Sequence, residues 1–364
     1  MRYPNSVTRI GEGALRCGLV GAGAIAQSYI QALEHCTEVQ LVAVADSRFD
    51  AAWRIGERMR CHSYDSIERM VSEAELDVAL VCTPPVTHPE ICVYLLENKI
   101  HVLCEKPFAI DSKGARRMLE SARQAGVMIT MASKFRYVDD VIRAKSIIAS
   151  GMLGDLILFE NVFSHCVDMS SRWNSRADIS GGGVLIDNGT HSVDLVHYFL
   201  GPLAELHAVE AKRRQGLLVE DTVFLLARSV SGVLCKIDLS WSVWPQRDSY
   251  LDICGTQGAV SVGWKKSVRL DSAHHQRVPL GNGYNKIQAF RNQIENFARA
   301  IRGEESLLIT ADDALESVRV IELAYQSLRE KQPVACGPSL FGPPRFESRK
   351  QPDLKLAKAA YIKS

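Results

Sequence analysis

The stretch LRCGLVGAGAIAQSYIQAL, residues 15–33, decides the fold expected for the first third of the chain. An apolar run typical of a buried strand leads into a glycine-rich turn, and a helical pattern follows the turn. The turn, Gly21-Ala22-Gly23-Ala24-Ile25-Ala26, fits the pattern G-x-G-x-x-G/A, in which the backbone closes on a pyrophosphate at a helix N-terminus. A tight turn that binds no ligand is the alternative interpretation.

Short apolar runs alternate with helical patterns as far as residue 133. Strands are predicted at 15–21, 39–46, 76–84, 100–106 and 127–133, with a helix in each interval. Continuous Val-, Ile- and Leu-rich strands separated by helices are typical of a parallel sheet covered on both faces. We therefore expect residues 15–133 to form an α/β domain with a doubly wound parallel sheet of the Rossmann type, preceded by an extension at 1–14.

A carboxylate at the end of the second predicted strand points to the cofactor. Asp46 lies about 20 residues beyond the glycines, where such a group binds the hydroxyls of an adenosine ribose. It repels a 2′-phosphate, so NAD is the expected cofactor. Arg48 can pair with such a phosphate, which leaves NADP as the alternative. The cofactor contacts expected from this half of the domain are Gly21, Gly23, Ala24, Ile25, Asp46 and Arg48.

Two further loops follow the third and fourth predicted strands. They are Thr83-Pro84-Pro85 and Glu105-Lys106-Pro107. A doubly wound sheet binds its ligand beyond the carboxyl ends of its strands, so we expect both loops to border the nicotinamide. Pro107 disfavours a helical conformation at Lys106 and so holds that side chain at the cleft. A surface loop with a Glu/Lys pair is the alternative.

The organisation changes at residue 134. A helix closed by Gly151 and Gly154 leads to an apolar run at 156–164, and short alternating runs from residue 203 predict an antiparallel sheet followed by two helices. Within 233–241, the odd positions are apolar and Lys236, Asp238 and Ser240 share the other face, so one face of this sheet is expected to be open. We interpret residues 134–336 as an α+β domain with an open, mostly antiparallel sheet.

Between helix and sheet, Gly181 to Gly183 lead into a helical pattern. Asp187, His191 and Asp194 are spaced by four and three residues, which places them on one face of that helix. An imidazole beside a carboxylate gains basicity, as a proton-accepting histidine needs. Three alternatives remain: the aspartates serve only as supports, His191 is a core residue, or the Asp/His pair binds metal. The only candidate for further metal ligands is His165-x-x-Asp168, which lies in a predicted loop, so no metal is expected.

Composition argues against several classes of protein. The 43 Lys and Arg residues nearly balance the 42 Asp and Glu residues, and a net charge of +1 argues against nucleic acid as a partner. No apolar run approaches the ~20 residues of a membrane span, and no signal peptide is recognisable, so a cytoplasmic location is expected. Ten cysteines without a C-x-x-C pair favour reduced core thiols. The basic, proline-containing tail at 337–364 is expected to be an extended arm or disordered.

Taken together, the motifs resemble the Gfo/Idh/MocA oxidoreductases, named for glucose-fructose oxidoreductase and inositol dehydrogenase. The resemblance spans about residues 15 to 335 and rests on the glycine turn, Thr83-Pro84-Pro85 with His88, Glu105-Lys106-Pro107, and the glycines before Asp187. It implies that Lys106, Asp187 and His191 are catalytic and that His88 lies at the cofactor. It also implies a cis Lys106-Pro107 peptide, and a dimer or tetramer formed through the second sheet.

The expected chemistry is hydride transfer between nicotinamide and a secondary alcohol or ketone. The resemblance implies that this substrate is a sugar, cyclitol or sugar derivative. His191, supported by Asp187, is expected to accept the hydroxyl proton, and Lys106 to stabilise charge on the oxygen, although these two roles can be exchanged. Substrate contacts are predicted at Arg136, Trp173 and Asn188. An interface ion pair is the alternative for Arg136, and core packing for Trp173. A non-catalytic sensor that keeps the dinucleotide fold is the alternative function.

Overall fold

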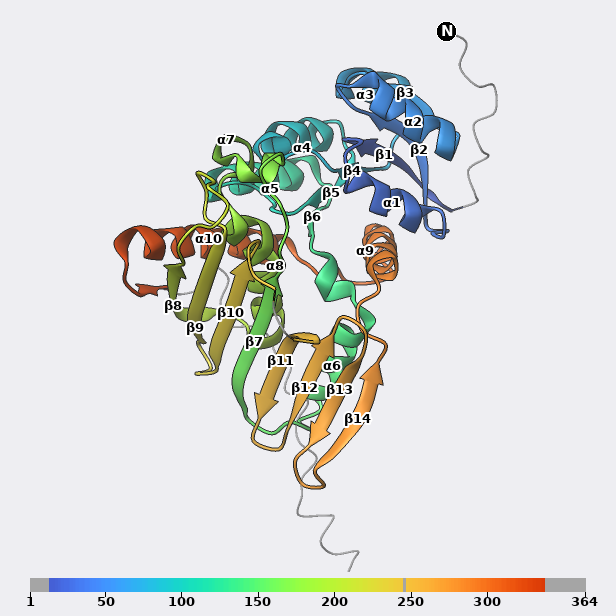
Figure 1. Cartoon of the computed structure of the whole chain (residues 1–364). Coiled ribbons are helices and arrows are strands. Elements are labelled where there is room, and N and C mark those ends of the chain that lie inside the picture. Colours follow the sequence, from blue (N-terminus) through green and yellow to red (C-terminus); the bar gives the residue numbers. More distant parts are fainter. Residues whose placement is uncertain (1–12, 245–246, 338–364) are drawn as a thin grey trace, which may run out of the picture.

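The structure is a computed structural model that describes residues 13–244 and 247–337. Its first sheet contains β1 (Leu15–Val20), β2 (Val39–Ala45), β3 (His62–Tyr64), β4 (Val78–Val81), β5 (His101–Glu105) and β6 (Ile129–Ala132). The order is β3-β2-β1-β4-β5-β6, and every pair is parallel. The helices are α1 (Ala26–Leu33), α2 (Phe49–Met59), α3 (Ile67–Glu73), α4 (His88–Glu97) and α5 (Ser112–Ala125) (Figure 1).

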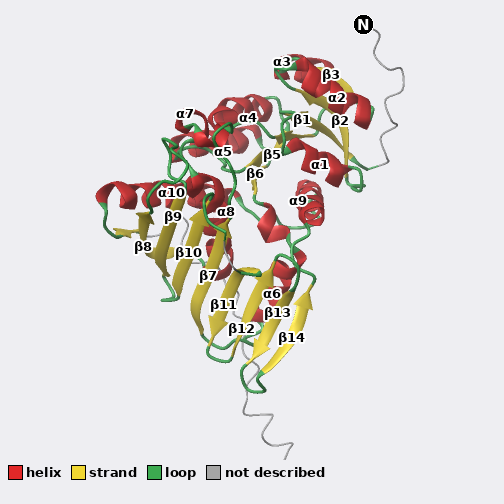
Figure 2. Cartoon of the chain, viewed as in Figure 1, coloured by secondary structure: helices red, strands yellow, loops and turns green. Residues whose placement is uncertain are grey.

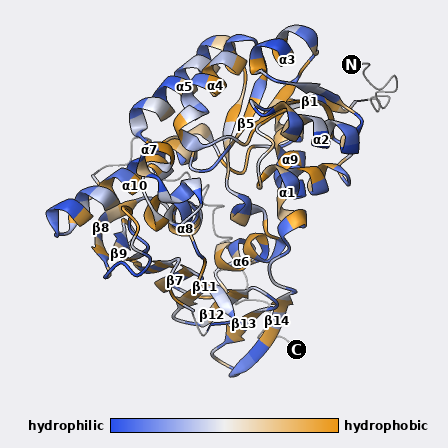
Figure 3. Cartoon of the chain, turned by 45° about the horizontal axis from the view of Figure 1, so that its top comes forward, coloured by the Kyte–Doolittle hydropathy of each residue, from blue (hydrophilic) through white to orange (hydrophobic). Residues whose placement is uncertain are grey.

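The strand order reverses between β1 and β4, so the sheet is doubly wound as predicted. Its apolar side chains divide between two core clusters, because helices cover both faces. Hydrophilic and hydrophobic residues alternate along α3, α4 and α5, as expected of helices with one buried face (Figure 3). The short strand β3 and helix α3 were not predicted. The extension at 1–14 and the tail at 337–364 lie almost wholly outside the described residues.

The second sheet follows a linker helix, α6 (Asp139–Ala149). Its strands are β7 (Leu156–Ser164), β8 (Leu203–Glu210), β9 (Thr222–Ser229), β10 (Leu234–Ser240), β11 (Ser249–Gly255), β12 (Gly258–Gly263), β13 (Ser267–Asp271), β14 (Gln276–Gly281) and β15 (Val334–Ala335). The order is β14-β13-β12-β11-β7-β10-β9-β8-β15, and among the described strands of this second sheet the β7–β10 pair alone is parallel. The mostly antiparallel sheet predicted for this half is confirmed.

One face of the second sheet is covered by α8 (Val184–Leu200) and α10 (Ala311–Glu330), which contact β8, β9 and β10 (Figure 2). The alternation predicted at 233–241 is confirmed, because Cys235, Ile237 and Leu239 are buried while Lys236 and Asp238 are partly exposed. Of the helices that the structure describes, none has the length and the apolar character that crossing a membrane requires.

Helix α9 (Lys286–Ile301) returns to the first sheet although it follows the second in sequence (Figure 1). Its apolar residues Phe290, Ile294 and Phe297 belong to the core cluster of β1, β2 and α1. The rings of Tyr29 and Phe290 meet edge to face with centroids 4.7 Å apart. The described strands of the first sheet all precede residue 134 and those of the second sheet all follow it, whereas α9, beyond residue 134, packs on the first sheet.

Candidate active site

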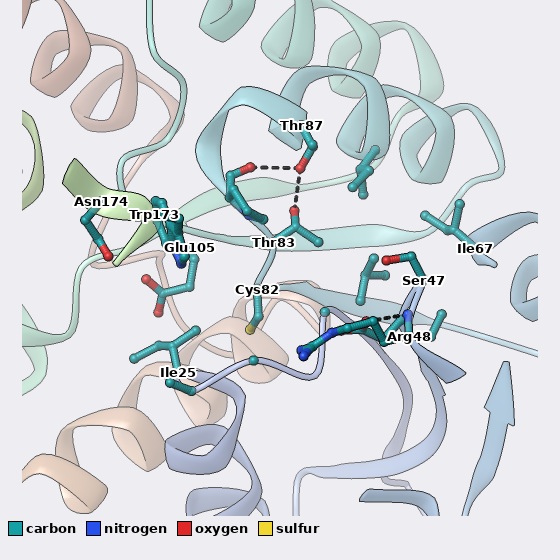
Figure 4. Close-up of a pocket in the computed structure, with 18 of the residues that line it drawn as sticks. Ile25, Ser47, Arg48, Ile67, Cys82, Thr83, Thr87, Glu105, Trp173 and Asn174 are labelled. Carbon is teal, nitrogen blue, oxygen red and sulfur yellow. Dashed lines mark hydrogen bonds and ion pairs between the residues drawn. The ribbon is translucent and has the colours of Figure 1, made fainter. Parts of the chain in front are cut away.

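A cavity of about 990 Å³ runs along the carboxyl edge of the first sheet. Figure 4 shows Glu105 and Trp173 at one end of this cavity and Arg48 and Ile67 at the other. The predicted site residues that line it are Gly21, Gly23, Ala24, Ile25, Asp46, Arg48, Thr83, Pro84, Glu105, Lys106, Trp173 and Asp187. These are 12 of the 25 residues that line the cavity, and most of the 12 lie at the carboxyl ends of parallel strands, where ligands are expected to bind.

The glycine turn fits a dinucleotide. Gly21 has φ of +94° and lies so close to β4 that an added Cβ would meet the Cys82 carbonyl carbon at 2.9 Å, so both conformation and space require glycine there. At Gly23 an added Cβ would meet no atom within 4 Å, which leaves open space at the N-terminus of α1. Backbone can therefore approach a pyrophosphate at this point, as the sequence predicts.

The Asp46 carboxylate is fixed beside the glycine turn. One oxygen accepts a hydrogen bond from the Ala22 amide at 2.7 Å and the other from the Arg48 amide at 2.9 Å. The Arg48 guanidinium lies 3.8 Å from the same carboxylate. Asp46 is thus held at the cavity and not turned away from it, which fits a ribose with free hydroxyls and therefore NAD.

His88 does not reach the cavity, contrary to its predicted cofactor contact. Its ring is buried, with Nδ1 3.0 Å from the Pro107 carbonyl oxygen and Nε2 2.9 Å from the Thr83 carbonyl oxygen. Each nitrogen thus faces a carbonyl oxygen of one of the two loops that border the cavity, and a neutral ring, which has a single N–H, donates a hydrogen bond to one of them. Burial lowers the pKa of His88, and this effect is larger than that of the neighbouring carbonyl groups, which raise it. The residue supports the Thr83 and Lys106 loops from behind.

A hydrogen-bonded chain positions the Lys106 loop. Glu105 is buried; one carboxylate oxygen accepts from the Tyr29 hydroxyl at 2.8 Å and the other from the Lys106 amide at 3.0 Å. Gln293 of α9 donates to the Tyr29 hydroxyl at 3.2 Å. Burial raises the pKa of Glu105, while Lys134 and Lys106 act in the opposite direction. The Lys106-Pro107 peptide is cis, as the resemblance implies.

Lys106 and Asp187 meet at the cavity from opposite halves of the chain. The Lys106 ammonium lies 2.5 Å from the Asp187 carboxylate and 3.1 Å from the Asp187 carbonyl oxygen. Both side chains keep a small exposed fraction, 16% and 18%. Asp187 occupies the first turn of α8, which follows the close approach of Gly183 to the Glu220 backbone. A charge-assisted donor therefore faces the cavity where a substrate oxygen can bind.

His191 is held by a different set of groups from the one predicted. Its Nδ1 lies 3.3 Å from the Ser133 hydroxyl and its Nε2 lies 3.4 Å from the Lys134 amine. Asp187, the predicted partner, bonds to Lys106 instead. Burial lowers the pKa of His191 well below its ordinary value, and Lys134 and Lys106 lower it further. The imidazole is therefore neutral at physiological pH.

Arg136 is part of a buried ion pair, the alternative that the sequence left open. Its guanidinium lies 2.7 Å from Asp194 and 3.3 Å from Asp313, and it is absent from the described lining of the cavity. The predicted substrate contact is therefore not supported. Asn188 also points elsewhere, since its amide donates to the Phe163 carbonyl oxygen at 2.8 Å. Trp173, which is 40% exposed, lies at the cavity as predicted.

The sequence interpretation missed several residues of the site. Lys134 follows the last parallel strand directly, so the reasoning that selected Lys106 applies to it equally. Arg172 and Asn174 flank Trp173 at the cavity, and Lys286 enters the lining from the start of α9. Lys286 had no sequence signal, because its position depends on how α9 packs. Within the described residues, no group of three or more His, Cys, Asp or Glu is arranged to hold a metal ion.

Comparison with known proteins identifies the two halves of the chain. The Gfo/Idh/MocA profile, described as an oxidoreductase family with an NAD-binding Rossmann fold, matches residues 15–133, and the Gfo/Idh/MocA C-terminal domain matches residues 141–261. D-glucoside 3-dehydrogenase from Escherichia coli (strain K12) is 32% identical to the chain, over 86% of this chain and 95% of its own length. Inositol 2-dehydrogenase from Rhizobium meliloti (strain 1021) is 23% identical, over 88% and 99%.

A solved structure shows the same fold. The WlbA dehydrogenase from Bordetella pertussis, in complex with NADH and UDP-GlcNAcA, aligns with a TM-score of 0.78 at 21% identity, over 90% of this chain and 99% of that one. The cofactor is NAD, in agreement with the glycine turn and with the fixed carboxylate of Asp46. The two matching profiles and the relative at 32% identity show that the chain belongs to the Gfo/Idh/MocA family of oxidoreductases.

Proposed function

We propose that the protein oxidises a secondary alcohol of a sugar, cyclitol or related polyol, or reduces the corresponding ketone. The observation that carries the proposal is the pairing of Lys106 with Asp187 at the cavity. The relatives named above support the substrate class, because they are dehydrogenases of a glucoside and of inositol. They give no support to a non-catalytic sensor.

The proposed roles follow from the groups at the cavity and next to it. Lys106, Asp187 and Trp173 line the cavity, whereas His191 is buried outside that lining. NAD supplies the hydride acceptor when it is bound. Lys106 lines the cavity, so we assign it the hydrogen bond to the reacting oxygen, whose negative charge it stabilises. His191 is neutral and its contact with Lys134 is long at 3.4 Å, so its Nε2 can exchange this contact for the substrate hydroxyl and accept the proton. Asp187 holds Lys106 in place, and Trp173 provides an apolar wall for the ring.

The test is the formation of NADH, followed by absorbance, with a panel of sugars, cyclitols and sugar derivatives. We expect Lys106→Met and His191→Asn each to reduce kcat by a factor of about 10² or more. Lys113→Met, at an exposed lysine on α5 outside the cavity, is the matched control and should keep full activity. Turnover that persists at the native rate in both site variants would refute the proposed roles.

We also propose that the uncovered face of the second sheet joins copies of this chain. Large apolar side chains project there, at exposed fractions of 45% to 59% for Phe224, Leu234 and Leu226. Val209 of β8, which pairs with Phe224, is 50% exposed. Contiguous apolar patches of this kind mark interaction sites. The double substitution Leu226→Lys/Leu234→Lys should lower the mass measured by light scattering to that of a monomer, and an unchanged mass would contradict this proposal.

A cytoplasmic location is proposed on the state of the cysteines. All ten are free thiols, and most of them are buried in the core. Reduced thiols are typical of proteins kept in a reducing compartment.

A further inference from the structure

Three consecutive residues surround the ring of His191. Ser133 lies 3.3 Å from Nδ1, and Lys134 lies 3.4 Å from Nε2. The ring of Phe135 meets the imidazole edge to face, with centroids 4.9 Å apart. The segment that follows β6 therefore fixes the ring plane of His191 and contacts both of its nitrogens.

The chemistry of these contacts determines the tautomer. A lysine ammonium has three donors and no acceptor, so the nitrogen that it faces must carry the lone pair. The proton of a neutral His191 then resides on Nδ1, where the Ser133 hydroxyl can accept it. Nε2, the nitrogen to which we assign proton acceptance, is thereby kept unprotonated.

Lys134 is a partly buried cation that lacks a carboxylate within ion-pair distance among the described residues. Its amine lies over two aromatic rings, 5.0 Å from the centroid of Phe135 and 5.8 Å from that of Phe290. Such faces stabilise an ammonium without neutralising its charge. The full positive charge of Lys134 is therefore felt by the imidazole next to it.

The charged groups around this pair come from β5 and its end, α8 and α9. Lys106 at the end of β5 acts on both His191 and Lys134, and Lys286 of α9 also acts on Lys134. The acids are Glu105 of β5 and Asp187 of α8, which act on Lys134. Burial and Lys106 lower the pKa of Lys134 to about 8, whereas Glu105 acts in the opposite direction. Lys134 is thus mostly protonated at neutral pH and loses its charge above it.

We propose that Lys134 is a positioning residue that keeps His191 neutral, with Nε2 ready to accept a proton, and so sets the pH above which the alcohol is oxidised. The proposal rests on the function proposed above. A cation beside a base disfavours protonation of that base, so removal of the Lys134 charge raises the pKa of His191. The protonated, inactive form of His191 then persists to higher pH. The acid limb of the pH profile moves upward as a result.

The direct test is a nitrogen NMR titration of the His191 ring in the protein without substrate, with the signals assigned through His191→Asn. Lys134→Met should raise the titration midpoint by about one pH unit or more, since the amine is close but partly solvated. Lys134→Gln, which can keep a hydrogen bond to Nε2 without the charge, should produce the same rise. Lys134→Arg keeps the charge and should leave the midpoint low.

The same variants are then compared in the pH dependence of kcat/KM with NAD. The acid limb should shift upward with Met and Gln but not with Arg, whereas a purely structural role would lower kcat without moving the limb. If the neutral variants fail to fold, the native protein still provides a test. Its His191 signals should show a second inflection near pH 8, where Lys134 loses its proton.

The outcomes separate the two proposals. A His191 midpoint that is equal in the native protein and in Lys134→Met, or no inflection near pH 8, overturns the role of Lys134 even if turnover is normal. A shifted midpoint in a protein that oxidises no polyol supports the role of Lys134 on His191 and refutes the proposed function.

Discussion

Replacement of Arg136 by methionine decides whether this arginine belongs to the structural core or to the substrate site. Its guanidinium is 3% exposed and lies 2.7 Å from Asp194, whose side chain is fully buried. It also donates to the Leu308 carbonyl oxygen at 3.1 Å. Methionine fills a similar volume but leaves the Asp194 charge without a partner. Since solvent screens this pair little, we expect the free energy of unfolding to fall by about 3–5 kcal/mol.

The assay is urea unfolding in the absence of NAD, together with steady-state kinetics at a temperature where the variant is folded. The control is the double variant Arg136→Met/Asp194→Leu, which removes both charges. Because the fully buried Asp194 carboxylate is gone and Asp313 keeps its contacts with His197 and the Thr310 amide, the double variant should recover much of the lost stability. KM for the substrate should change little in either variant. An unchanged unfolding midpoint combined with a raised KM would show that Arg136 binds substrate and that the ion pair is unimportant.

Two further predictions concern the cofactor site. Gly23→Val should leave the melting temperature without NAD unchanged, since nothing lies within 4 Å of the added Cβ, but should weaken NAD binding at least tenfold, by about 1.4 kcal/mol. Gly21→Ala is the contrasting variant: with φ of +94° and the Cys82 carbonyl carbon at 2.9 Å, it should cost about 1–3 kcal/mol of stability even without NAD. An equal fall in melting temperature in the two variants would contradict this distinction between Gly21 and Gly23. Asp46→Ala should raise the Kd for NAD about tenfold or more, through loss of hydrogen bonds to a charged acceptor, and relax discrimination against NADP. Calorimetric titration with both cofactors measures this, and an unchanged preference for NAD would place the discrimination elsewhere.

The sequence was sufficient for the first sheet because each of its long strands is a continuous apolar run followed by a helix. The strand β3 has three residues, too few for any periodicity to appear. Helix α9 illustrates a different limit. The spacing of Phe290, Ile294 and Phe297 predicts a helix with an apolar face, but the same face can cover either sheet. Only the three-dimensional contact with Tyr29 decides between them.

The site residues divide in a similar way. Asp46 and Lys106 were predicted from their places at strand ends, and a strand end fixes which edge of the sheet a residue reaches. His88 was selected through the family resemblance and Arg136 for its side-chain chemistry, and neither ground says where the side chain points. A histidine can pack between the carbonyl groups of two loops, and an arginine can neutralise buried aspartates, without either touching a ligand. These two side chains do so.

The spacing of Asp187 and His191 carries the same lesson further. A separation of four residues puts both side chains on one face of α8, yet it does not make them partners, because each has a nearer group from another element. β5 brings Lys106 to Asp187, and the segment after β6 brings Lys134 to His191. The site is therefore two amine-containing pairs, one that lines the cavity and one behind it. Because Lys106 also acts on His191, a proton gained or lost in one pair changes the proton affinity of the other.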